Sequence, residues 1–168
     1  MTLLSCLPFT LDTFVQKGDI EKIRDLVAST HTFRPIEVDI ACELVQTHID
    51  GNFLDYAFMF ARDEKNNIMG YTCYGEIPLT EKRFDLYWIV VSPLHQGKKI
   101  GLALLQATEK AILDMTHAAT HIYAETSGTS DYVTAQQFYL KQGFSEIARL
   151  TDFYRTGDDK IIYRKLIR

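Results

Sequence analysis

The sequence has few of the features that mark secreted or membrane proteins. Its three cysteines (Cys6, Cys42 and Cys73) are odd in number and have no CxxC spacing, so neither a disulfide framework nor a zinc knuckle is indicated. No apolar run approaches the roughly 20 residues needed to cross a bilayer. The opening segment also lacks the basic region of a signal peptide. We therefore expect a cytoplasmic protein in a reducing compartment, with no membrane partner.

Positive charge and metal-binding patterns are scarce as well. The net charge is −4 at pH 7, whereas phosphate contacts to nucleic acid need a basic surface, so no nucleic-acid partner is expected. His117 and His121 have helical spacing but lack the Glu of an HExxH pattern, so no metal site is expected. The local exception in charge is the pair Lys98-Lys99.

The chain also lacks internal repeats, low-complexity stretches and linker-like segments. Its 168 residues, with 46% hydrophobic and 24% charged residues, fit one soluble globular domain with a sizeable core. We therefore predict a single domain over residues 1–168, as a monomer or a homodimer.

Hydrophobic periodicity predicts a mixed α/β protein. Two amphipathic helices come first, followed by strands whose apolar residues alternate or run continuously. A strand, a helix and a further strand after Phe84 imply one parallel pair. The predicted elements are a helix at 20–30 with Asp19 as N-cap, a helix at 36–49 opened by Pro35, strands Asp55–Arg62, Ile68–Ile77 and Phe84–Val91, a helix from about Lys99 to Thr116, a strand Ile122–Ala124, a helix Asp131–Gln142, and the strands Phe144–Tyr154 and Lys160–Ile167.

A turn that contains glycine joins the strand Phe84–Val91 to the next helix. The segment 91–105 reads VSPLHQGKKIGLALL. The first turn of a helix has unpaired N–H groups and favours negative charge, and Lys98 and Lys99 add positive charge nearby. The residues thus fit an anion site, with phosphate as the expected ligand. A plain strand–helix turn with a solvated lysine pair fits them too, because the phosphate patterns GxxxxGK(S/T) and GxGxxG are both absent.

This segment resembles the acetyl-CoA signature of the GCN5-related N-acetyltransferase (GNAT) family, V-x-P-x-x-Q/R-x-x-G-x-G/A followed by a leucine-rich helix. Lys99 occupies the position of the middle glycine in that signature. If the helix begins at about Lys99, the side chain can point outward, and its ammonium is available to a phosphate. The matching residues are Val91, Pro93, Gln96, Gly97, Ile100, Gly101, Leu104 and Leu105.

A second segment, 132–144 (YVTAQQFYLKQGF), resembles the family's other marker, N-x-x-A-x-x-F/L-Y-x-x-x-G-F. Tyr132 replaces the frequent Asn. The family's tyrosine points at the coenzyme sulfur, so Tyr139 is expected to donate a proton to the departing thiolate. Phe138 and Phe144 are expected to be core aromatics. The matching residues are Ala135, Phe138, Tyr139, Gly143 and Phe144.

The resemblance implies the GNAT fold, a mixed central β-sheet, mostly antiparallel with a splayed parallel pair, flanked by helices. Pantetheine would pair with the exposed edge of strand Phe84–Val91, and an N–H near Ile89 would face the developing oxyanion. Pyrophosphate would accept hydrogen bonds from the turn. The implied coenzyme-binding residues are Ile89, Val90, Val91, Gln96, Gly97, Lys98, Lys99, Ile100, Gly101, Leu102, Ser127, Tyr132 and Tyr139.

Two roles are implied for Asp85, and both stay open. In histone-acetylating members of the family a Glu lies eleven residues before the Gln of the turn, and Asp85 holds that position here. Asp85 is either the catalytic base, acting through water because its side chain is shorter, or a surface charge at the end of a strand. Thr126 and Ser127 follow the next strand and can orient a water or a pantetheine amide.

These observations predict an acyltransferase that moves an acetyl group from acetyl-CoA to a primary amine of a small molecule or peptide by direct attack on the thioester. The residues predicted to contact the acceptor are Tyr74, Glu76 and Glu125. The acidic residues around the presumed groove, Glu76, Asp85 and Glu125, indicate a cationic acceptor such as an amino sugar, a polyamine or a lysine. A catalytically silent acyl-CoA-binding module of the same fold is the alternative, supported by the missing middle glycine. A nucleotide-phosphate binder of another fold is a third interpretation.

Overall fold

The computed structural model describes residues 8–52 and 55–168. The first seven residues, which include Cys6 and part of the opening segment that is not expected to be a signal peptide, lie outside the described part. The chain divides into two compact units. The first comprises the described residues up to Cys73 together with Trp88–Thr108, and the second comprises Tyr74–Tyr87 together with Glu109–Arg168.

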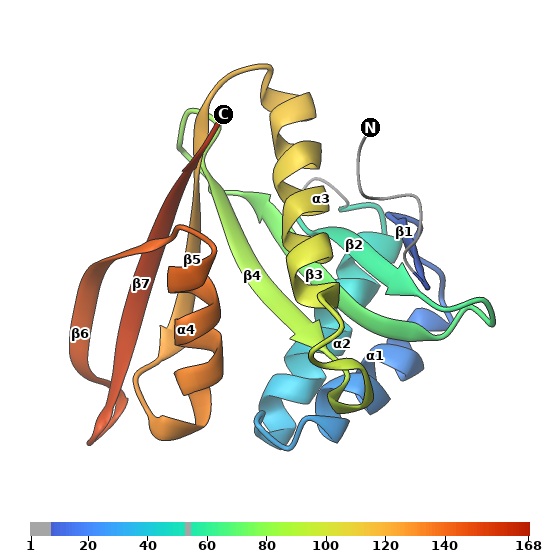
Figure 1. Cartoon of the computed structure of the whole chain (residues 1–168), viewed down its shortest axis with the longest axis horizontal. Coiled ribbons are helices and arrows are strands. Elements are labelled where there is room, and N and C mark those ends of the chain that lie inside the picture. Colours follow the sequence, from blue (N-terminus) through green and yellow to red (C-terminus); the bar gives the residue numbers. More distant parts are fainter. Residues whose placement is uncertain (1–7, 53–54) are drawn as a thin grey trace. The chain divides into compact units, whose positions relative to one another are not determined.

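The strands form one seven-stranded sheet in the order β1-β2-β3-β4-β5-β7-β6 (Figure 1). β4 and β5 are parallel, whereas β1–β2, β5–β7 and β6–β7 are antiparallel, so the predicted mixed sheet with a parallel pair is confirmed. The elements are β1 (Thr10–Asp12), α1 (Asp19–Ser29), α2 (Pro35–Ile49), β2 (Ala57–Arg62), β3 (Ile68–Glu76), β4 (Phe84–Val91), the 3-10 helix η2 (Pro93–His95), α3 (Ile100–Thr116), β5 (Thr120–Ser127), the 3-10 helix η3 (Ser130–Tyr132), α4 (Val133–Lys141), β6 (Ser145–Arg155) and β7 (Asp158–Ile167).

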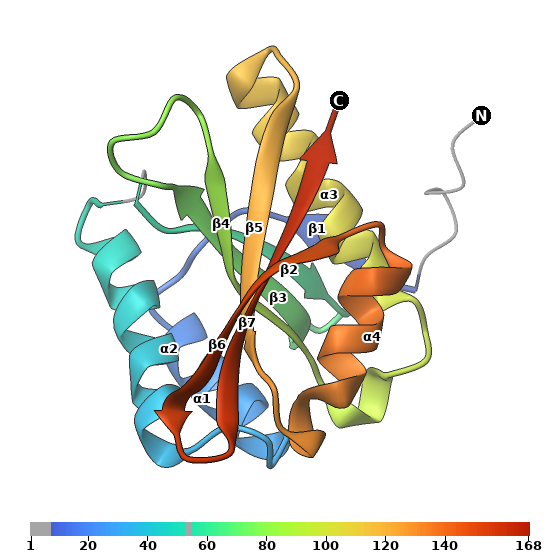
Figure 2. The same ribbon diagram turned by 90° about the vertical axis from the view of Figure 1, so that its left-hand side faces the viewer.

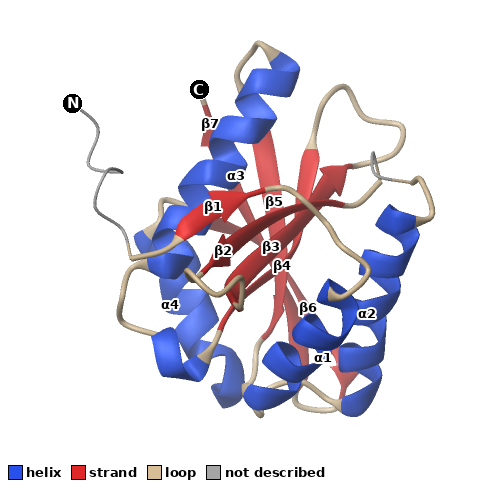
Figure 3. Ribbon diagram, turned by 90° about the vertical axis from the view of Figure 1, so that its right-hand side faces the viewer, coloured by secondary structure: helices blue, strands red, loops and turns tan. Residues whose placement is uncertain are grey.

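In the first unit, α1 and α2 lie side by side and bury their apolar stripes against β2 and β3 (Figure 3). Ile23 and Val27 of α1 are fully buried in one cluster with Phe58, Phe60 and Tyr71 of the strands. Burying aromatic and branched side chains of this size is the main stabilising contribution to such a unit.

Gly70 permits a close approach between β3 and the end of β4. A Cβ atom at this position would lie only 2.7 Å from the Val90 carbonyl oxygen, so any side chain would force the backbones apart. The Ser92 N–H donates a hydrogen bond to the Met69 carbonyl at 2.9 Å, just beyond β4. The strand end that leads into the predicted anion site is therefore held firmly within its unit.

β1 is held in place by a buried ionic network that the sequence did not predict. Both terminal nitrogens of Arg62 donate to the Asp19 carboxylate, at 3.0 and 2.9 Å, and its Nε donates to Asp12 at 3.1 Å. The prediction that Asp19 is an N-cap was wrong: Gly18 is the N-cap, and Asp19 is the first residue of α1. The Asp19 carboxylate is fully buried, and its charge is balanced by Arg62. It also accepts a hydrogen bond from the Gln16 N–H at 2.9 Å.

In the second unit, α4 contacts β7 through the Tyr139 and Tyr163 rings and contacts the end of β5 through a hydrogen bond from Gln136 to the Ser127 carbonyl. Figure 2 shows α4 beside these strands. Gly143 has a φ of +84° and ends α4, while the Phe144 N–H donates to the Tyr139 carbonyl at 3.0 Å. β5 is longer than the predicted Ile122–Ala124, because β7 pairs with it from Thr120 to Ser127. The polar residues Glu125–Ser127 gave no apolar signal for that extension.

The helices of the described residues include none with both the length and the apolar character that crossing a bilayer requires.

Candidate active site

The turn between β4 and α3 contains two residues in the left-handed region. Gly97 has a φ of +76° and Lys99 a φ of +62°. The first intrahelical bond of α3 runs from the Ala103 N–H to the Lys99 carbonyl at 3.0 Å. Lys99 therefore precedes the helix instead of lying within it. Alternating backbone conformations of this kind turn successive N–H groups toward one side and form an anion-binding concavity.

The prediction that the helix already includes Lys99 is corrected by this conformation. Lys99 adopts the backbone angles that a glycine at the family's position would supply without strain. A side chain in this region costs about 1–2 kcal/mol. Lys99 therefore combines a left-handed backbone with an ammonium-bearing side chain in this turn.

The turn is accessible to a ligand from solvent. Gln96, Gly97, Lys98 and Lys99 are exposed, whereas Ile100 is buried and anchors the start of α3. The N–H groups of the first helical turn, residues 100–102, have no carbonyl one turn earlier to accept them. They are the donors that the predicted pyrophosphate contacts require, and the positive end of the helix dipole lies at the same place.

His95 is a feature of this turn that the sequence did not single out. Its Nδ1 is buried and, within the part of the chain that the structure describes, has no hydrogen-bond partner. The His95 N–H closes η2 by donating to the Ser92 carbonyl at 2.8 Å. Only its place inside the family signature could have drawn attention to it.

In the second unit, Tyr139 lies inside an aromatic cluster. Its ring centroid is 5.4 Å from that of Phe144, 5.5 Å from that of Tyr163 and 5.9 Å from that of Phe138. Burial, and secondarily the neighbouring Tyr163, raise the pKa of the Tyr139 phenol above its ordinary value of about 10. The phenol therefore stays protonated at neutral pH and can act as a donor. Tyr132, which ends η3, is half-buried.

Ser127 ends β5, and its hydroxyl ties β5 to the β6–β7 hairpin. Ser127 Oγ donates to Asp158 Oδ1 at 2.5 Å and accepts from the Thr129 N–H at 3.1 Å. Its carbonyl accepts from Gln136 Nε2 at 2.9 Å. Ser127 Oγ also shares a hydrogen bond with Thr129 Oγ1 at 2.8 Å, so a coenzyme contact through this hydroxyl would compete with the bonds that it already makes. Thr126 is buried beside it.

Asp85 lies on β4 opposite Tyr123 of β5, on the strand pair that is parallel. Burial, and secondarily the nearby Glu125 carboxylate, raise the pKa of Asp85 to about 6, although the Lys160 ammonium acts in the opposite direction. Among the described residues, Asp85 has no hydrogen-bond or ion-pair partner. A half-buried carboxylate with this pKa has the properties of a general base near neutral pH.

The predicted acceptor residues of the second unit differ in their surroundings. Glu125 forms an ion pair with Lys160, and Glu76 forms one with Lys82 at 3.6 Å. Tyr74 is buried, with only 3% of its surface exposed. Lys160 is distant from Glu125 in sequence, and Lys82 is separated from Glu76 by a loop. The sequence spacing of these residues therefore did not predict either ion pair.

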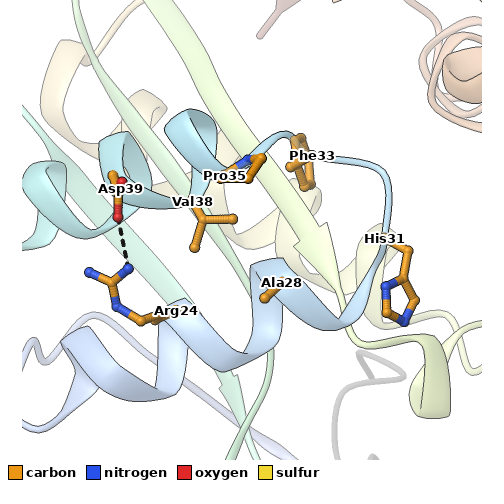
Figure 4. A pocket seen from close by; sticks show the side chains of 7 residues that line it. All are labelled: Arg24, Ala28, His31, Phe33, Pro35, Val38 and Asp39. Atoms are coloured by element: carbon orange, nitrogen blue, oxygen red, sulfur yellow. Dashed lines mark hydrogen bonds and ion pairs between the residues drawn. The ribbon is translucent and has the colours of Figure 1, made fainter.

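A cavity of about 500 Å³ lies in the groove between α1 and α2 (Figure 4). An ion pair between Arg24 and Asp39, 2.8 Å apart, lies on its rim. None of the predicted site residues lines it. The lining residues are Arg24, Ala28, His31, Phe33, Pro35, Val38 and Asp39. Within residues 8–52 and 55–168, no group of three or more His, Cys, Asp or Glu side chains is arranged to hold a metal ion.

Comparison with known proteins identifies the family. The acetyltransferase (GNAT) domain family matches residues 55–146. The chain is also similar to a GNAT-family protein of Desulfovibrio desulfuricans that is assigned as an acetyltransferase, with 41% identity and a TM-score of 0.87. That match covers 94% of this chain and 98% of the other. Comparison with curated proteins finds no match.

Two more distant structures share the fold. An aminoglycoside 6'-N-acetyltransferase complexed with coenzyme A is 18% identical, with a TM-score of 0.72 over 95% of this chain and 97% of that one. The NatC complex bound to Gag peptide and CoA gives 15% identity and a TM-score of 0.73 over 96% of this chain and 100% of that one. From the matched domain and the 41% identical relative, we conclude that the chain belongs to the GNAT family and is an acyltransferase.

Proposed function

We propose that the protein transfers an acetyl group from acetyl-CoA to a primary amine by direct attack on the thioester. The observation that carries this proposal is the turn at Gly97–Gly101, where two left-handed residues precede the N-terminus of α3. Such a turn fits a pyrophosphate group, because the N–H groups at the start of α3 lack intrahelical acceptors and Lys98 and Lys99 add positive charge. Family membership, and the coenzyme named in the two distant structures, support acetyl-CoA as the donor.

The coenzyme contacts are assigned by position in the family signature. The N–H groups of Gly97, Lys99, Ile100 and Gly101 would hold the pyrophosphate, with Lys98 contributing charge and Gln96 and Leu102 bordering the turn. The backbone of Ile89, Val90 and Val91 would pair with pantetheine, and the N–H near Ile89 would stabilise the oxyanion. Ser127 and Tyr132 complete the proposed set. When bound, the coenzyme supplies a thioester carbonyl that is activated toward amines.

Tyr139 would protonate the leaving thiolate. Burial keeps its phenol neutral, as a donor requires, because the charged phenolate is disfavoured in the aromatic cluster. The same burial excludes bulk water as a competing donor around the ring.

Asp85 would remove the proton from the attacking amine, directly or through a water molecule. Its raised pKa of about 6 keeps it mostly ionised at neutral pH while leaving it a stronger base than an ordinary aspartate. It also has no competing partner among the described residues, so the carboxylate is available to an incoming ammonium. These two properties favour the base over a plain strand-end charge.

The acceptor is proposed to be a primary amine of a small molecule or peptide, contacted by Tyr74, Glu76 and Glu125. A cytoplasmic location is proposed because Cys42 and Cys73 are free and buried, as in a reducing compartment. The missing glycine supports the silent-module alternative less strongly, since Lys99 adopts a left-handed backbone of the kind that glycine takes without strain.

The test is to incubate the purified protein with acetyl-CoA and a panel of amines while free thiol and acetylated product are measured. Release of thiol that depends on one class of amine is the expected result. Tight CoA binding in a calorimeter without turnover on any amine would instead favour the silent module. Binding of ATP without binding of CoA would contradict both.

A further inference from the structure

A cation site on the second unit is already filled by the chain itself. Glu125 on β5 lies opposite Ile162 of β7. Lys160 lies two residues before Ile162 on β7, so its side chain is on the same face of the sheet as Glu125 and is its diagonal neighbour. The Lys160 ammonium forms an ion pair with the Glu125 carboxylate. Its Nζ also lies 4.8 Å from the centre of the Phe153 ring on β6.

The two groups that hold the Lys160 ammonium are those that proteins use to recognise ammonium ligands. A carboxylate supplies charge, and an aromatic face adds cation–π attraction. Only 17% of the Lys160 side chain is exposed, whereas 45% of Glu125 and 52% of Phe153 are exposed. The Glu125 carboxylate and the Phe153 ring are therefore accessible to solvent, whereas the Lys160 side chain that contacts them is mostly buried.

The second acidic residue predicted to contact the acceptor is neutralised in the same way. Glu76 forms an ion pair with Lys82, whose N–H also donates to the Glu76 carboxylate at 3.3 Å. Of the three carboxylates at Glu76, Asp85 and Glu125, only Asp85 is without a partner within the described residues. Lys160 acts on Asp85 without forming an ion pair, so the Asp85 carboxylate is the one of the three that the ammonium of the reacting amine can pair with directly.

We propose that Lys160 is a specificity-determining residue whose ammonium occupies the Glu125–Phe153 cation site and thereby excludes a second positive charge on the acceptor. The acceptor class is then an amine with a single positive charge near the reacting nitrogen, not a polyamine. This inference rests on the proposed function, because it concerns the acceptor of that reaction. It differs from the simpler expectation that the acidic residues select strongly cationic acceptors, and the experiment below decides between the two.

The test compares the binding of two probes, cadaverine and n-pentylamine, which differ by one ammonium group. Binding is followed by NMR through the side-chain carboxyl resonances of Glu125 and Asp85, at a pH above the Asp85 pKa of about 6, where both amines are charged. Wild type is expected to bind the two probes with dissociation constants within about twofold of each other. Lys160→Met, which keeps the apolar stem and removes the charge, is expected to bind cadaverine about tenfold more tightly than n-pentylamine.

Two further variants identify the cause. Lys160→Arg keeps the cation and should behave as wild type, whereas Lys160→Met combined with Glu125→Gln should lose the gain in cadaverine binding. Thermal melting checks that each variant is folded, and Lys160→Gln replaces Lys160→Met if the latter does not fold. A wild type that already prefers cadaverine, an unchanged ratio without the Lys160 charge, or a gain that survives Glu125→Gln would overturn the inference.

The binding test contains no acetyl-CoA, so its failure is distinct from failure of the proposed function. If the wild type acetylates no amine at all, the proposed function is wrong, while the binding ratios still decide what Lys160 does. If turnover occurs, the ratio of kcat/KM for cadaverine to that for n-pentylamine should rise about tenfold on Lys160→Met, in parallel with binding.

Discussion

At the residue scale, Lys99 is where this chain departs from the family signature and yet keeps its geometry. The position needs a left-handed backbone, which glycine supplies freely and lysine adopts at a cost. We interpret the lysine as an exchange of some stability for a positive charge beside the proposed pyrophosphate. Gly97, two residues earlier, keeps the glycine that the same turn requires.

Replacing Lys99 tests this interpretation. Lys99→Gly and Lys99→Ala both remove the charge, but only glycine relieves the left-handed strain. We expect the free energy of unfolding of Lys99→Gly to exceed that of Lys99→Ala by about 1 kcal/mol, measured by urea denaturation. At Lys98, which is not left-handed, glycine should give no advantage over alanine. Equal stabilities of the two Lys99 variants would show that the position is not strained.

Tyr139→Phe removes the proposed proton donor while keeping the ring in its aromatic cluster. We expect kcat to fall by about one to three orders of magnitude, with little change in the KM for acetyl-CoA. Tyr163→Phe is the control, because Tyr163 is a buried residue of the same cluster but is not assigned a role in the chemistry. An unchanged kcat in Tyr139→Phe, or an equal loss in both variants, would remove Tyr139 from the reaction.

The raised pKa of Asp85 predicts a pH dependence. As the base must be ionised, kcat/KM should rise with pH through about 6 and then level off. Asp85→Asn should abolish most of the activity, and the remaining activity should no longer rise with pH through about 6. If kcat/KM of Asp85→Asn still rises through the same pH, the titrating group is not Asp85.

The same pKa makes a separate prediction for stability. Since the folded-state pKa lies above the ordinary value, the native state binds the proton more tightly than the unfolded chain does. Ionisation of Asp85 therefore opposes folding, and its contribution to stability decreases as pH rises from about 4 to about 6. The difference in unfolding free energy between Asp85→Asn and wild type should grow over that range in favour of the variant. A constant difference would contradict the raised pKa.

At the scale of elements, hydrophobic periodicity predicted the long helices and strands but not the short strand β1, which lies beside ionic contacts between residues distant in sequence. The bounds of β4 and the existence of both N-terminal helices were predicted, because their apolar patterns are long and regular. β1 has only three residues and no period. It pairs with β2, and Arg62 of β2 binds both Asp12 of β1 and Asp19 of α1. No local pattern signals such a strand.

Removing Arg62 measures the contribution of that network. Arg62→Leu leaves the fully buried Asp19 carboxylate without its cation, so we expect the free energy of unfolding to fall by about 3–5 kcal/mol. Arg24→Leu breaks an exposed ion pair with Asp39 and serves as the control, with a much smaller loss. If the two variants lose the same stability in denaturant titrations, the buried network does not hold β1.

At the scale of the whole molecule, the fold class and the segments that form the candidate site were predicted from the sequence. The backbone angles and the contact partners of the residues in those segments were not. The two signature segments carry enough fixed positions to identify the family. The left-handed Lys99, the Lys160 ammonium beside Glu125 and the hydroxyl bond of Ser127 to Asp158 could not be predicted. Each depends on a backbone angle or on a partner brought close only by folding.

The central claim is direct transfer of the acetyl group from acetyl-CoA to an amine, without an acetylated enzyme. The buried Cys42 and Cys73 thiols, whose pKa values burial raises, are poor nucleophiles and agree with that claim. The most direct measurement is the initial rate of amine acetylation as both substrates are varied, with a mass spectrum of the protein after exposure to acetyl-CoA alone. We predict intersecting double-reciprocal lines and an unmodified protein. Parallel lines together with a protein heavier by one acetyl group would contradict the account.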